Sequence, residues 1–387
     1  MVGLALVVAT AAACSESGQP GTSQPVAGQP GAAGGTTASV GASPARPKTL
    51  RVVAAGDLFV QPDLTAQAAA DARAAGKTGH DFTQILAAIA PMVREADLAV
   101  CHVEQPLAPP EGPFTGYPIF SAPPQLADAA AATGFDTCST ASNHTLDYGE
   151  EGVRRTLDNL DRVGLRHSGS ARAAAEAATP NVFGVRGVKV AQLAYTFSFN
   201  GIERPRDKPW LANPIDVARI RADAHAAKQA GAEIVILSMH WGTEYQNEAN
   251  EEQAGLAAQL LADPDIDLII GLHVHVVQPF EKIGDKWVAY GLGNLLVRFQ
   301  DGSPENTRDS VLPRFTFTEV APKKWRVTDL AVHAIFMAYH PQARLVDLAA
   351  ATKNDDTPGA DYARVLRRIA GYVNMRGAQA NGLRMVN

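Results

Sequence analysis

Short apolar runs alternate with amphipathic stretches from Leu50 onward, and this alternation constrains the fold more than any other feature of the sequence. Glycines at 134, 164 and 231 follow three of the amphipathic stretches, where glycine commonly ends a helix. The expected strands are LRVVAA, DLAVCHV, FDTCSTA, KVAQLAYTF, EIVILSMH, DLIIGL, WVAYGLG, RFTFTEV and WRVTDLAVHAIF. The expected helices are FTQILAAIAPMVREA, PPQLADAAAATG, EEGVRRTLDNLDRVG, PIDVARIRADAHAAKQAG, NEEQAGLAAQLLAD and the tail DYARVLRRIAGYVNMRG. Strands that alternate with helices predict an α/β fold.

Length and charge narrow the class of protein. The chain has 387 residues, of which 46% are hydrophobic, so it can bury a substantial core. Its 34 basic and 40 acidic residues give a net charge of −6, which provides no general attraction for a polyanion. We therefore expect no nucleic-acid partner.

The first 46 residues differ from the rest. Residues 1–14, MVGLALVVATAAAC, resemble a bacterial lipoprotein signal in which Cys14 becomes the lipidated N-terminus. The alternative is an ordinary secretory signal in which Cys14 is incidental. Residues 15–46 are rich in Gly, Pro, Ser and Ala, which predicts a disordered tether. We expect an exported protein, either a lipoprotein on the outer face of the cytoplasmic membrane, touching it through the lipid anchor only, or a secreted one.

Polar residues that can bind metals follow five of the expected strands. In open α/β sheets, ligands bind at the carboxyl ends of the strands, so these residues are expected to converge. They are Asp57, His102 with Glu104, Asn143 with His144, His240, and His273 with His275.

The mixture of imidazole and carboxylate groups favours one or two divalent ions of the Mn, Fe or Zn class over Ca²⁺ or Mg²⁺. His273 and His275 are two residues apart, so an extended backbone would direct both rings to one side. The same alternation places His102 and Glu104 on one side of their strand.

The motifs GD, HVEQPL, SNHTLDYG, HWGTEY and GLHVHVVQPFEKIGDKWVAYGLGN resemble the CapA (poly-γ-glutamate capsule synthesis) family, a branch of the calcineurin-like metallophosphoesterases. The resemblance covers roughly Leu50 to Ala338. It implies a four-layer α/β/β/α sandwich with a one- or two-metal site. It also implies that His144 donates a proton or contacts phosphate and that Glu104 is a bridging carboxylate. The implied metal ligands are Asp57, Asn143, His240, His273 and His275.

Two positions depart from the pattern that this resemblance implies. Phe59 stands where the wider superfamily has the histidine of its Asp-x-His motif, and His102 stands where CapA proteins commonly have Asn. We interpret His102 as replacing the imidazole missing at Phe59 and supplying a metal ligand; the alternative is that it only hydrogen-bonds Glu104. Asp147 is predicted either to orient His144 or to cap the helix that follows it.

Two functions remain open. The first is a metal-dependent hydrolase acting on a phosphoester or on an envelope polymer such as poly-γ-glutamate. The second is a non-catalytic component of capsule-like polymer synthesis or export, acting within a synthesis complex. Further candidates are the pocket residues Tyr195, Asn200 and Gly201, for which an ordinary polar loop is the alternative, and the anion-binding residues Arg172, Arg204, Arg206 and Arg298.

The expected organisation is a signal at 1–14, a tether at 15–46, a CapA-like domain at 47–340 and a C-terminal helical extension at 341–387. Cys101 and Cys138 both lie in expected strands. The sequence favours two buried thiols over a disulfide, because disulfides between neighbouring strands are geometrically awkward.

Overall fold

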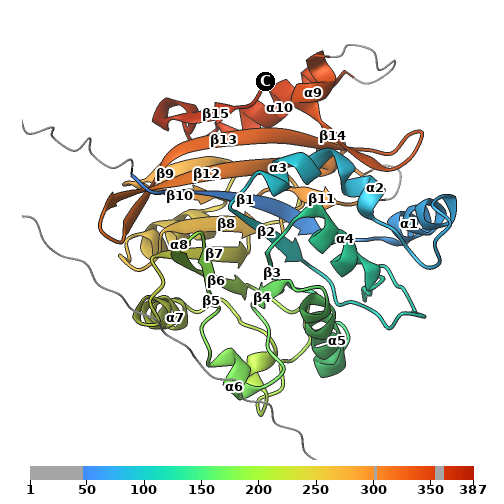
Figure 1. Cartoon of the computed structure of the whole chain (residues 1–387), viewed down its shortest axis with the longest axis horizontal. Helices are drawn as coiled ribbons and strands as arrows, with labels where there is room; N and C mark the ends of the chain where they lie inside the picture. Colours follow the sequence, from blue (N-terminus) through green and yellow to red (C-terminus); the bar gives the residue numbers. More distant parts are fainter. Residues whose placement is uncertain (1–46, 300–302, 354–360) are drawn as a thin grey trace, which may run out of the picture. The chain divides into compact units, whose positions relative to one another are not determined.

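Two β-sheets packed face to face form the centre of the computed structural model, which describes residues 47–299, 303–353 and 361–387 (Figure 1). The expectations for residues 1–14 and 15–46 lie outside the described residues. The nine-stranded sheet has the order β14-β13-β12-β1-β2-β3-β4, with β11 beside β1 and β15 beside β13. The six-stranded sheet has the order β5-β6-β7-β8-β10-β9.

The strands of the larger sheet are β1 (Thr49–Leu58), β2 (Leu98–Val103), β3 (Thr137–Ser139), β4 (Arg166–Ser168), β11 (Asn294–Leu296), β12 (Asp309–Ala321), β13 (Lys324–Ala338), β14 (Arg344–Asp347) and β15 (Leu383–Met385). Those of the smaller sheet are β5 (Val182–Val185), β6 (Val188–Thr196), β7 (Ile234–His240), β8 (Leu268–Leu272), β9 (Phe280–Ile283) and β10 (Lys286–Ala289). The helices are α1 (Pro62–Ala74), α2 (Thr83–Leu86), α3 (Ala90–Arg94), α4 (Gln125–Thr133), α5 (Gly149–Arg162), α6 (Ala174–Ala177), α7 (Val217–Gln229), α8 (Glu251–Leu261), α9 (Leu348–Lys353) and α10 (Tyr362–Val373).

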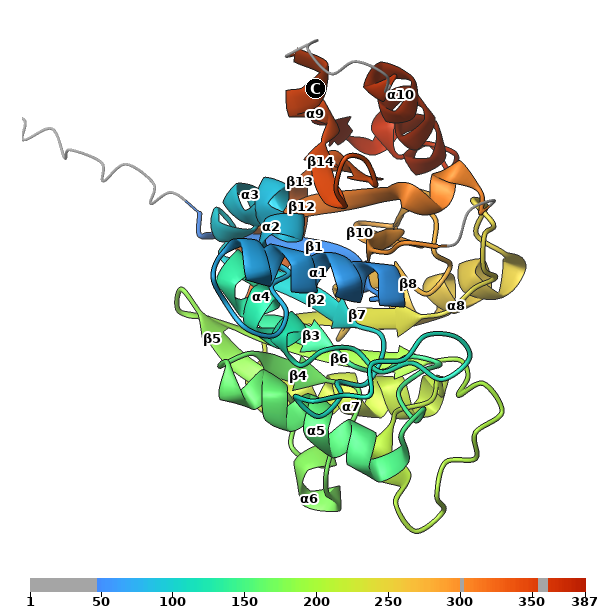
Figure 2. The same cartoon turned by 90° about the vertical axis from the view of Figure 1, so that its right-hand side faces the viewer.

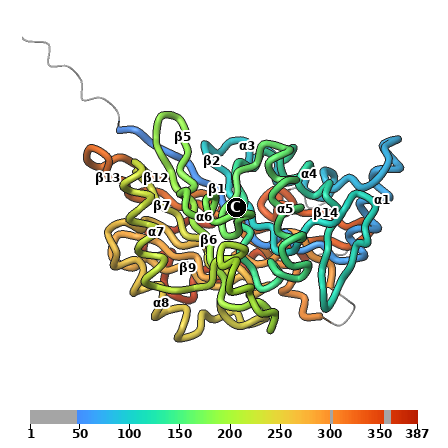
Figure 3. Tube along the Cα trace, turned by 90° about the horizontal axis from the view of Figure 1, so that it is seen from below, coloured from blue at the N-terminus to red at the C-terminus, as the bar shows by residue number. Residues whose placement is uncertain are grey.

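Helices cover the outer face of each sheet, so the expected α/β/β/α sandwich is confirmed (Figure 2). Three apolar clusters separate the four layers. One packs α1 to α5 on the larger sheet, one lies between the sheets, and one packs α7 and α8 on the smaller sheet. Some segments that are far apart in the sequence pair directly. For example, β1, at the start of the described chain, lies antiparallel to β12 (Figure 3).

Several elements differ from the predictions, and local chemistry explains why. The stretch FTQILAAIAPMVREA is α2, a 3₁₀ turn and α3 rather than one helix, because Pro91 lacks an amide hydrogen and clashes with the preceding turn. Helix α1 has no counterpart among the expected helices, because Leu64 is the only large apolar residue among those it buries, which also include Ala68, Asp71 and Ala72. The strands that the sequence did not reveal, β4, β5, β9, β11, β14 and β15, have three or four residues each, too few for a clear alternation.

Within the segment 341–387, expected to be a helical extension, the described residues also include strands of the main sheet. It contributes strands β14 and β15, both paired with β13. Helix α10 buries Val365, Ile369 and Val373 in the cluster between the sheets. These apolar positions make the helix visible in the sequence, whereas the short strands on either side give no signal.

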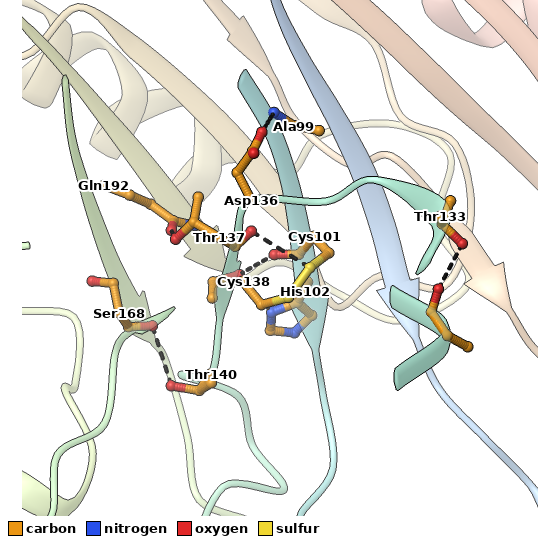
Figure 4. Close-up of a disulfide and its surroundings, with 12 residues drawn as sticks. Ala99, Cys101, His102, Thr133, Asp136, Thr137, Cys138, Thr140, Ser168 and Gln192 are labelled. Carbon is orange, nitrogen blue, oxygen red and sulfur yellow. Dashed lines mark hydrogen bonds between the residues drawn. A yellow bond between two sulfur atoms is a disulfide. The ribbon is translucent and has the colours of Figure 1, made fainter. Parts of the chain in front are cut away.

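Cys101 and Cys138 form a disulfide, so the prediction of two buried thiols is wrong (Figure 4). The two residues lie directly opposite one another on the parallel strands β2 and β3. Their Cα atoms are 4.4 Å apart, at the short end of the range that a disulfide spans. The sequence did not reveal this register.

None of the helices within the described ranges has both the length and the apolar composition needed to cross a membrane.

Candidate metal centre

The polar residues at the strand ends lie together between the two sheets. Asp57 is the last residue but one of β1, and His102 is the last but one of β2. Glu104 directly follows β2, and His240 ends β7. Asn143 and His144 follow β3, and His273 and His275 follow β8. All of these residues are at most 7% exposed. The convergence predicted from strand polarity is therefore what the structure contains.

Asp57 lies at the middle of this cluster. Its Oδ1 is 3.8 Å from His102 Nε2, and its Oδ2 is 3.7 Å from His275 Nδ1. The backbone N–H of His273 also points at both oxygens, at 3.4 and 3.3 Å. Gly56 makes this position possible, because a Cβ there would lie 1.8 Å from the Gly293 carbonyl oxygen.

Two groups of three buried ligand atoms share Asp57. One group is Asp57, His102 and His240, and the other is Asp57, Glu104 and His275. Within each group, the atoms lie within 4.8 Å of one another. A third group joins His273 and His275 to the exposed carboxylate of Glu244.

Five buried atoms of the cluster have no hydrogen-bond partner among the described residues. They are both carboxylate oxygens of Glu104, Nε2 of His102, and Nδ1 of His240 and of His273. An unsatisfied buried polar group costs about 1–3 kcal/mol, so five together call for a compensating ligand. Imidazole nitrogens and carboxylate oxygens fit a divalent metal ion.

Hydrogen bonds set the tautomers of two histidines. Asn294 Oδ1 can only accept, because its Nδ2 donates to two carbonyls, so His275 Nδ1 donates to it at 2.8 Å. Ser139 donates to the Cys101 carbonyl and therefore accepts from His102 Nδ1 at 2.8 Å. Nε2 of each ring is left with a lone pair that faces the cluster.

Burial governs the charge of the cluster. It lowers the pKa of His102 to about 3 and that of His275 to about 4, and it holds the pKa values of His240 and His273 well below the usual range. These rings are therefore neutral, as metal ligands must be.

The buried carboxylates shift the other way. Burial raises the pKa of Asp57 to about 8, and burial together with the neighbouring Asp57 raises the pKa of Glu104 well above its usual range. A bound cation would favour the ionised form of both groups.

The backbone at His273 and His275 is not extended, which corrects the prediction. Their φ angles are +90° and +58°, in the left-handed region that residues other than glycine rarely adopt. The two ring centroids are nevertheless 5.9 Å apart, so both rings reach the cluster from a turn rather than from a strand. Such backbone strain is typical of functional sites.

His144 is held by Asp147. Its Nδ1 is 2.8 Å from Asp147 Oδ2, which also accepts the backbone N–H of Phe120 at 2.8 Å. The alternative that Asp147 caps α5 does not hold, because Tyr148 occupies the cap position without a side-chain bond.

Asn143 joins the same region to β7. Its Oδ1 accepts from His240 Nε2 at 2.9 Å, and its Nδ2 donates to Asn200 Oδ1 at 3.3 Å. Asn200 thus lies at the cluster, as the sequence suggested.

The imidazole of His102 does not occupy the place that a histidine at position 59 would have. The Phe59 ring stacks on His275 at 5.1 Å, whereas the His102 ring is 5.1 Å from His240. Asp57 separates the two sides. The alternative that His102 hydrogen-bonds Glu104 is also not observed, since the facing atoms of both are unpaired within the described part of the chain.

Sequence reasoning missed some residues and misplaced another. Glu244 and Asn294 lie inside the motifs HWGTEY and GLGN, but Ser139 gave no signal. Tyr195 does not line the cluster: its hydroxyl donates to Asp223 at 2.9 Å, and it borders a separate cavity of about 710 Å³ beside β4, α6 and α7.

The fold and the cluster define an α/β protein with a candidate metal centre at its strand ends. Residues 51–298, well over half of the chain, match the family described as bacterial capsule synthesis protein PGA_cap. The chain belongs to this family, which confirms the resemblance found in its motifs.

Two curated relatives illustrate the match. The chain is 30% identical over 201 residues to PGA biosynthesis protein CapA of Bacillus subtilis (strain 168), covering 51% of each chain. It is 29% identical over 198 residues to capsule biosynthesis protein CapA of Bacillus anthracis, covering 50% of this chain and 47% of that one. The chain thus spans about half the length of these relatives.

Solved structures resemble the chain more distantly. A 5′-nucleotidase precursor from Thermus thermophilus has a TM-score of 0.47 at 14% identity, covering 84% of this chain and 60% of that one. Calcineurin-like phosphoesterase YfkN from Bacillus subtilis has a TM-score of 0.44 at 13% identity, covering 83% and 96%. Scores this low add nothing to the argument about function.

Proposed function

We propose that this chain is a surface-tethered, metal-dependent hydrolase that acts on a phosphoester or on an envelope polymer such as poly-γ-glutamate. The observation that carries the proposal is the His144 and Asp147 pair beside a cluster of unpaired ligand atoms within the described chain. A purely structural metal site has no need of an imidazole oriented by a carboxylate.

Asp57, Glu104 and His275 would hold one ion, and Asp57, His102 and His240 the other. Asn143 and His273 would complete the ligand set. When bound, divalent ions of the Mn, Fe or Zn class supply Lewis acidity and a water molecule of lowered pKa.

The protein's own groups would handle the proton and the substrate. Because Nδ1 of His144 is engaged by Asp147, its Nε2 is left to give a proton to the leaving group. Asp147 fixes the orientation of the His144 ring. The rings of Phe59 and Phe120 pack against His144, with centroids 5.8 and 4.6 Å from the centroid of its ring. They limit the movement of His144 and its contact with water.

The second candidate is a non-catalytic component of capsule-like polymer synthesis or export. It is favoured by the names of the relatives, which refer to capsule and PGA biosynthesis, and by Phe59, which lacks a ligand atom where the wider superfamily has histidine. Partners in a synthesis complex would belong to this function. Four arginines were considered for anion binding, namely Arg172, Arg204, Arg206 and Arg298. Each of them already contacts a carboxylate or a carbonyl of the chain itself.

The test combines metal analysis of the purified full chain with assays on bis(p-nitrophenyl) phosphate and on poly-γ-glutamate. His144→Gln should lower turnover by about 10²- to 10⁴-fold without changing the metal content. His225→Gln is the matched control, because His225 pairs with Asp265 at 2.9 Å on the surface. A fully metallated wild type that hydrolyses neither substrate would favour the non-catalytic function.

Surface tethering is tested separately. Cys14→Ala, expressed with its own N-terminal sequence, should release the protein from the membrane fraction. Unchanged membrane fractionation would count against the lipid anchor.

A further inference from the structure

The disulfide lies directly beneath the candidate metal centre. In the register of β2 and β3, Cys101 pairs with Cys138, and the next residues, His102 and Ser139, pair with each other. Successive residues of a strand point to opposite faces. The disulfide accordingly packs in the helix-covered core, while His102 and Ser139 face the centre.

Ser139 is the neighbour that orients His102. Its hydroxyl donates to the Cys101 carbonyl at 3.4 Å and accepts from His102 Nδ1 at 2.8 Å. This leaves His102 Nε2, which has no partner within the described residues, facing Asp57 Oδ1 at 3.8 Å. The hydroxyl of Ser139 is the side-chain partner of His102 Nδ1.

The disulfide compensates for a short strand. β3 has only three residues, Thr137–Ser139, and the loop that follows it carries Asn143 and His144. β3 is paired over three residues with β2 on one side and over three with β4 on the other. Ser142 Oγ also donates to the Glu104 carbonyl, so the loop after β3 contacts the loop after β2. A covalent bond one residue before Ser139 holds both segments in one register.

We propose that Ser139 and the Cys101–Cys138 disulfide are positioning groups of the metal centre: Ser139 fixes the tautomer and orientation of His102, and the disulfide fixes the register that brings the two together. The inference rests on the metal binding of the proposed function but not on hydrolysis. It predicts that affinity on the His102 and His240 side depends on a bond outside the centre.

The first experiment is a titration of the metal-free full chain with Mn²⁺. Calorimetry and the electron paramagnetic resonance signal of free Mn²⁺ monitor the binding. Ser139→Ala should weaken one of two bound equivalents by about 10- to 100-fold, whereas Ser139→Thr, which keeps the hydroxyl, should stay close to wild type. Ser310→Ala is the matched control, since Ser310 is a buried serine whose side chain bonds the Leu292 carbonyl. Wild-type affinity for both equivalents in Ser139→Ala would overturn the role of Ser139.

The second experiment needs no metal. Nitrogen-15 correlation spectra of the histidine side chains should show His102 of the wild type protonated at Nδ1, and Ser139→Ala should lose this preference. An unchanged tautomer would contradict the inference even if metal binding changed.

The third experiment reduces the disulfide with a trialkylphosphine. The S–S bond breaks and is reduced by two electrons from phosphorus. Phosphorus takes the oxygen of one water molecule to become the phosphine oxide, and the two hydrogens of that water convert the sulfurs to two thiols. Reduction should weaken the same Mn²⁺ equivalent in the wild type. The Cys101→Ala, Cys138→Ala double variant should start weakened and not respond to the phosphine. Unchanged Mn²⁺ affinity in both cases would overturn the role of the disulfide.

The outcomes also separate this inference from the proposed function. Mn²⁺ binding that depends on Ser139, without hydrolysis, would retain the positioning groups and reject the hydrolase. A wild type that takes up no Mn²⁺ would reject both the metal centre and its positioning groups.

Discussion

Beside α10, Asp309 is as deeply buried as Glu104 is in the metal centre, but the two carboxylates have opposite surroundings. Asp309 accepts bonds from Arg368 at 2.6 and 2.8 Å, and Arg368 also reaches Glu305 at 2.7 Å. Glu104 has no hydrogen-bond partner for either oxygen within the described chain, and it lies beside another carboxylate, Asp57. The difference shows that the fold can pair a buried carboxylate with a cation from its own chain, and that at Glu104 it does not.

The first region joins the C-terminal helix to the main sheet, so its paired charges serve stability. The second region gathers ligand atoms that face one another without partners in the described chain, so it is suited to binding a cation. A buried carboxylate without a partner is costly, and it persists where a bound cation offsets the cost.

The largest expected effect is the loss of metal binding in the second region, with the first region left intact. His273→Ala combined with His275→Ala should abolish stoichiometric metal binding, because it removes two of the imidazoles that reach the cluster. The sheets should remain folded, as judged by circular dichroism. Full metal occupancy in this double variant, measured by elemental analysis, would reject the centre.

Breaking the first region should affect stability and leave metal binding unchanged. Arg368→Met leaves Asp309 buried without its cation and should lower the free energy of unfolding by roughly 3 kcal/mol in denaturant titrations. Arg364→Met is the control, since Arg364 is half exposed and pairs with Glu305 in contact with solvent, so its loss should have a much smaller effect. Equal effects of the two variants would erase the distinction between buried and surface pairs.

A smaller effect tests one side of the centre. His102→Asn should lower the affinity for one of the two ions by at least about 10-fold, because it removes an imidazole that faces Asp57. Phe59→His, added to this variant, should not restore that ion, since Phe59 lies on the His275 side. Metal stoichiometry under a fixed chelator challenge measures both. Unchanged binding in His102→Asn would mean that His102 is not a ligand.

The smallest effect is a difference in pH dependence. Burial raises the pKa of Asp309 to about 6 from an ordinary value of 3.8, so between these values the folded state keeps a proton that the unfolded state has lost. Stability from this group therefore falls by about 1 kcal/mol between about pH 5 and about pH 6.

The histidines of the metal-free centre act in the opposite direction. Their lowered pKa values make the unfolded state bind more protons below about pH 6.5, so their contribution to stability falls as the pH decreases towards about 4. The free energy of unfolding of Asp309→Asn and of the wild type should be measured from about pH 4 to about pH 7. The difference between the two proteins separates the pH dependence due to Asp309 from that due to the histidines. Identical slopes would show that Asp309 is not the titrating group.

The sequence predicted what depends on strand polarity and missed what depends on register. Asp57 and His240 end long apolar runs, so their meeting at one edge followed from the α/β pattern. Ser139 and the disulfide partner of Cys101 depend on which residues of β2 and β3 face each other, which no local pattern encodes. The left-handed backbone of His273 was also hidden, because turn propensity favours Gly and Asn there. The strands β14 and β15 were too short to detect.

The two oxygens of Asp57 face different imidazoles, one belonging to each proposed ion site. In thermodynamic terms, two ions bound there would share one negative charge and one displaced proton, so occupancy of either site must change the affinity of the other by an equal factor. The binding isotherm of such a centre is therefore not the sum of two independent curves, and its shape measures the coupling through a single carboxylate.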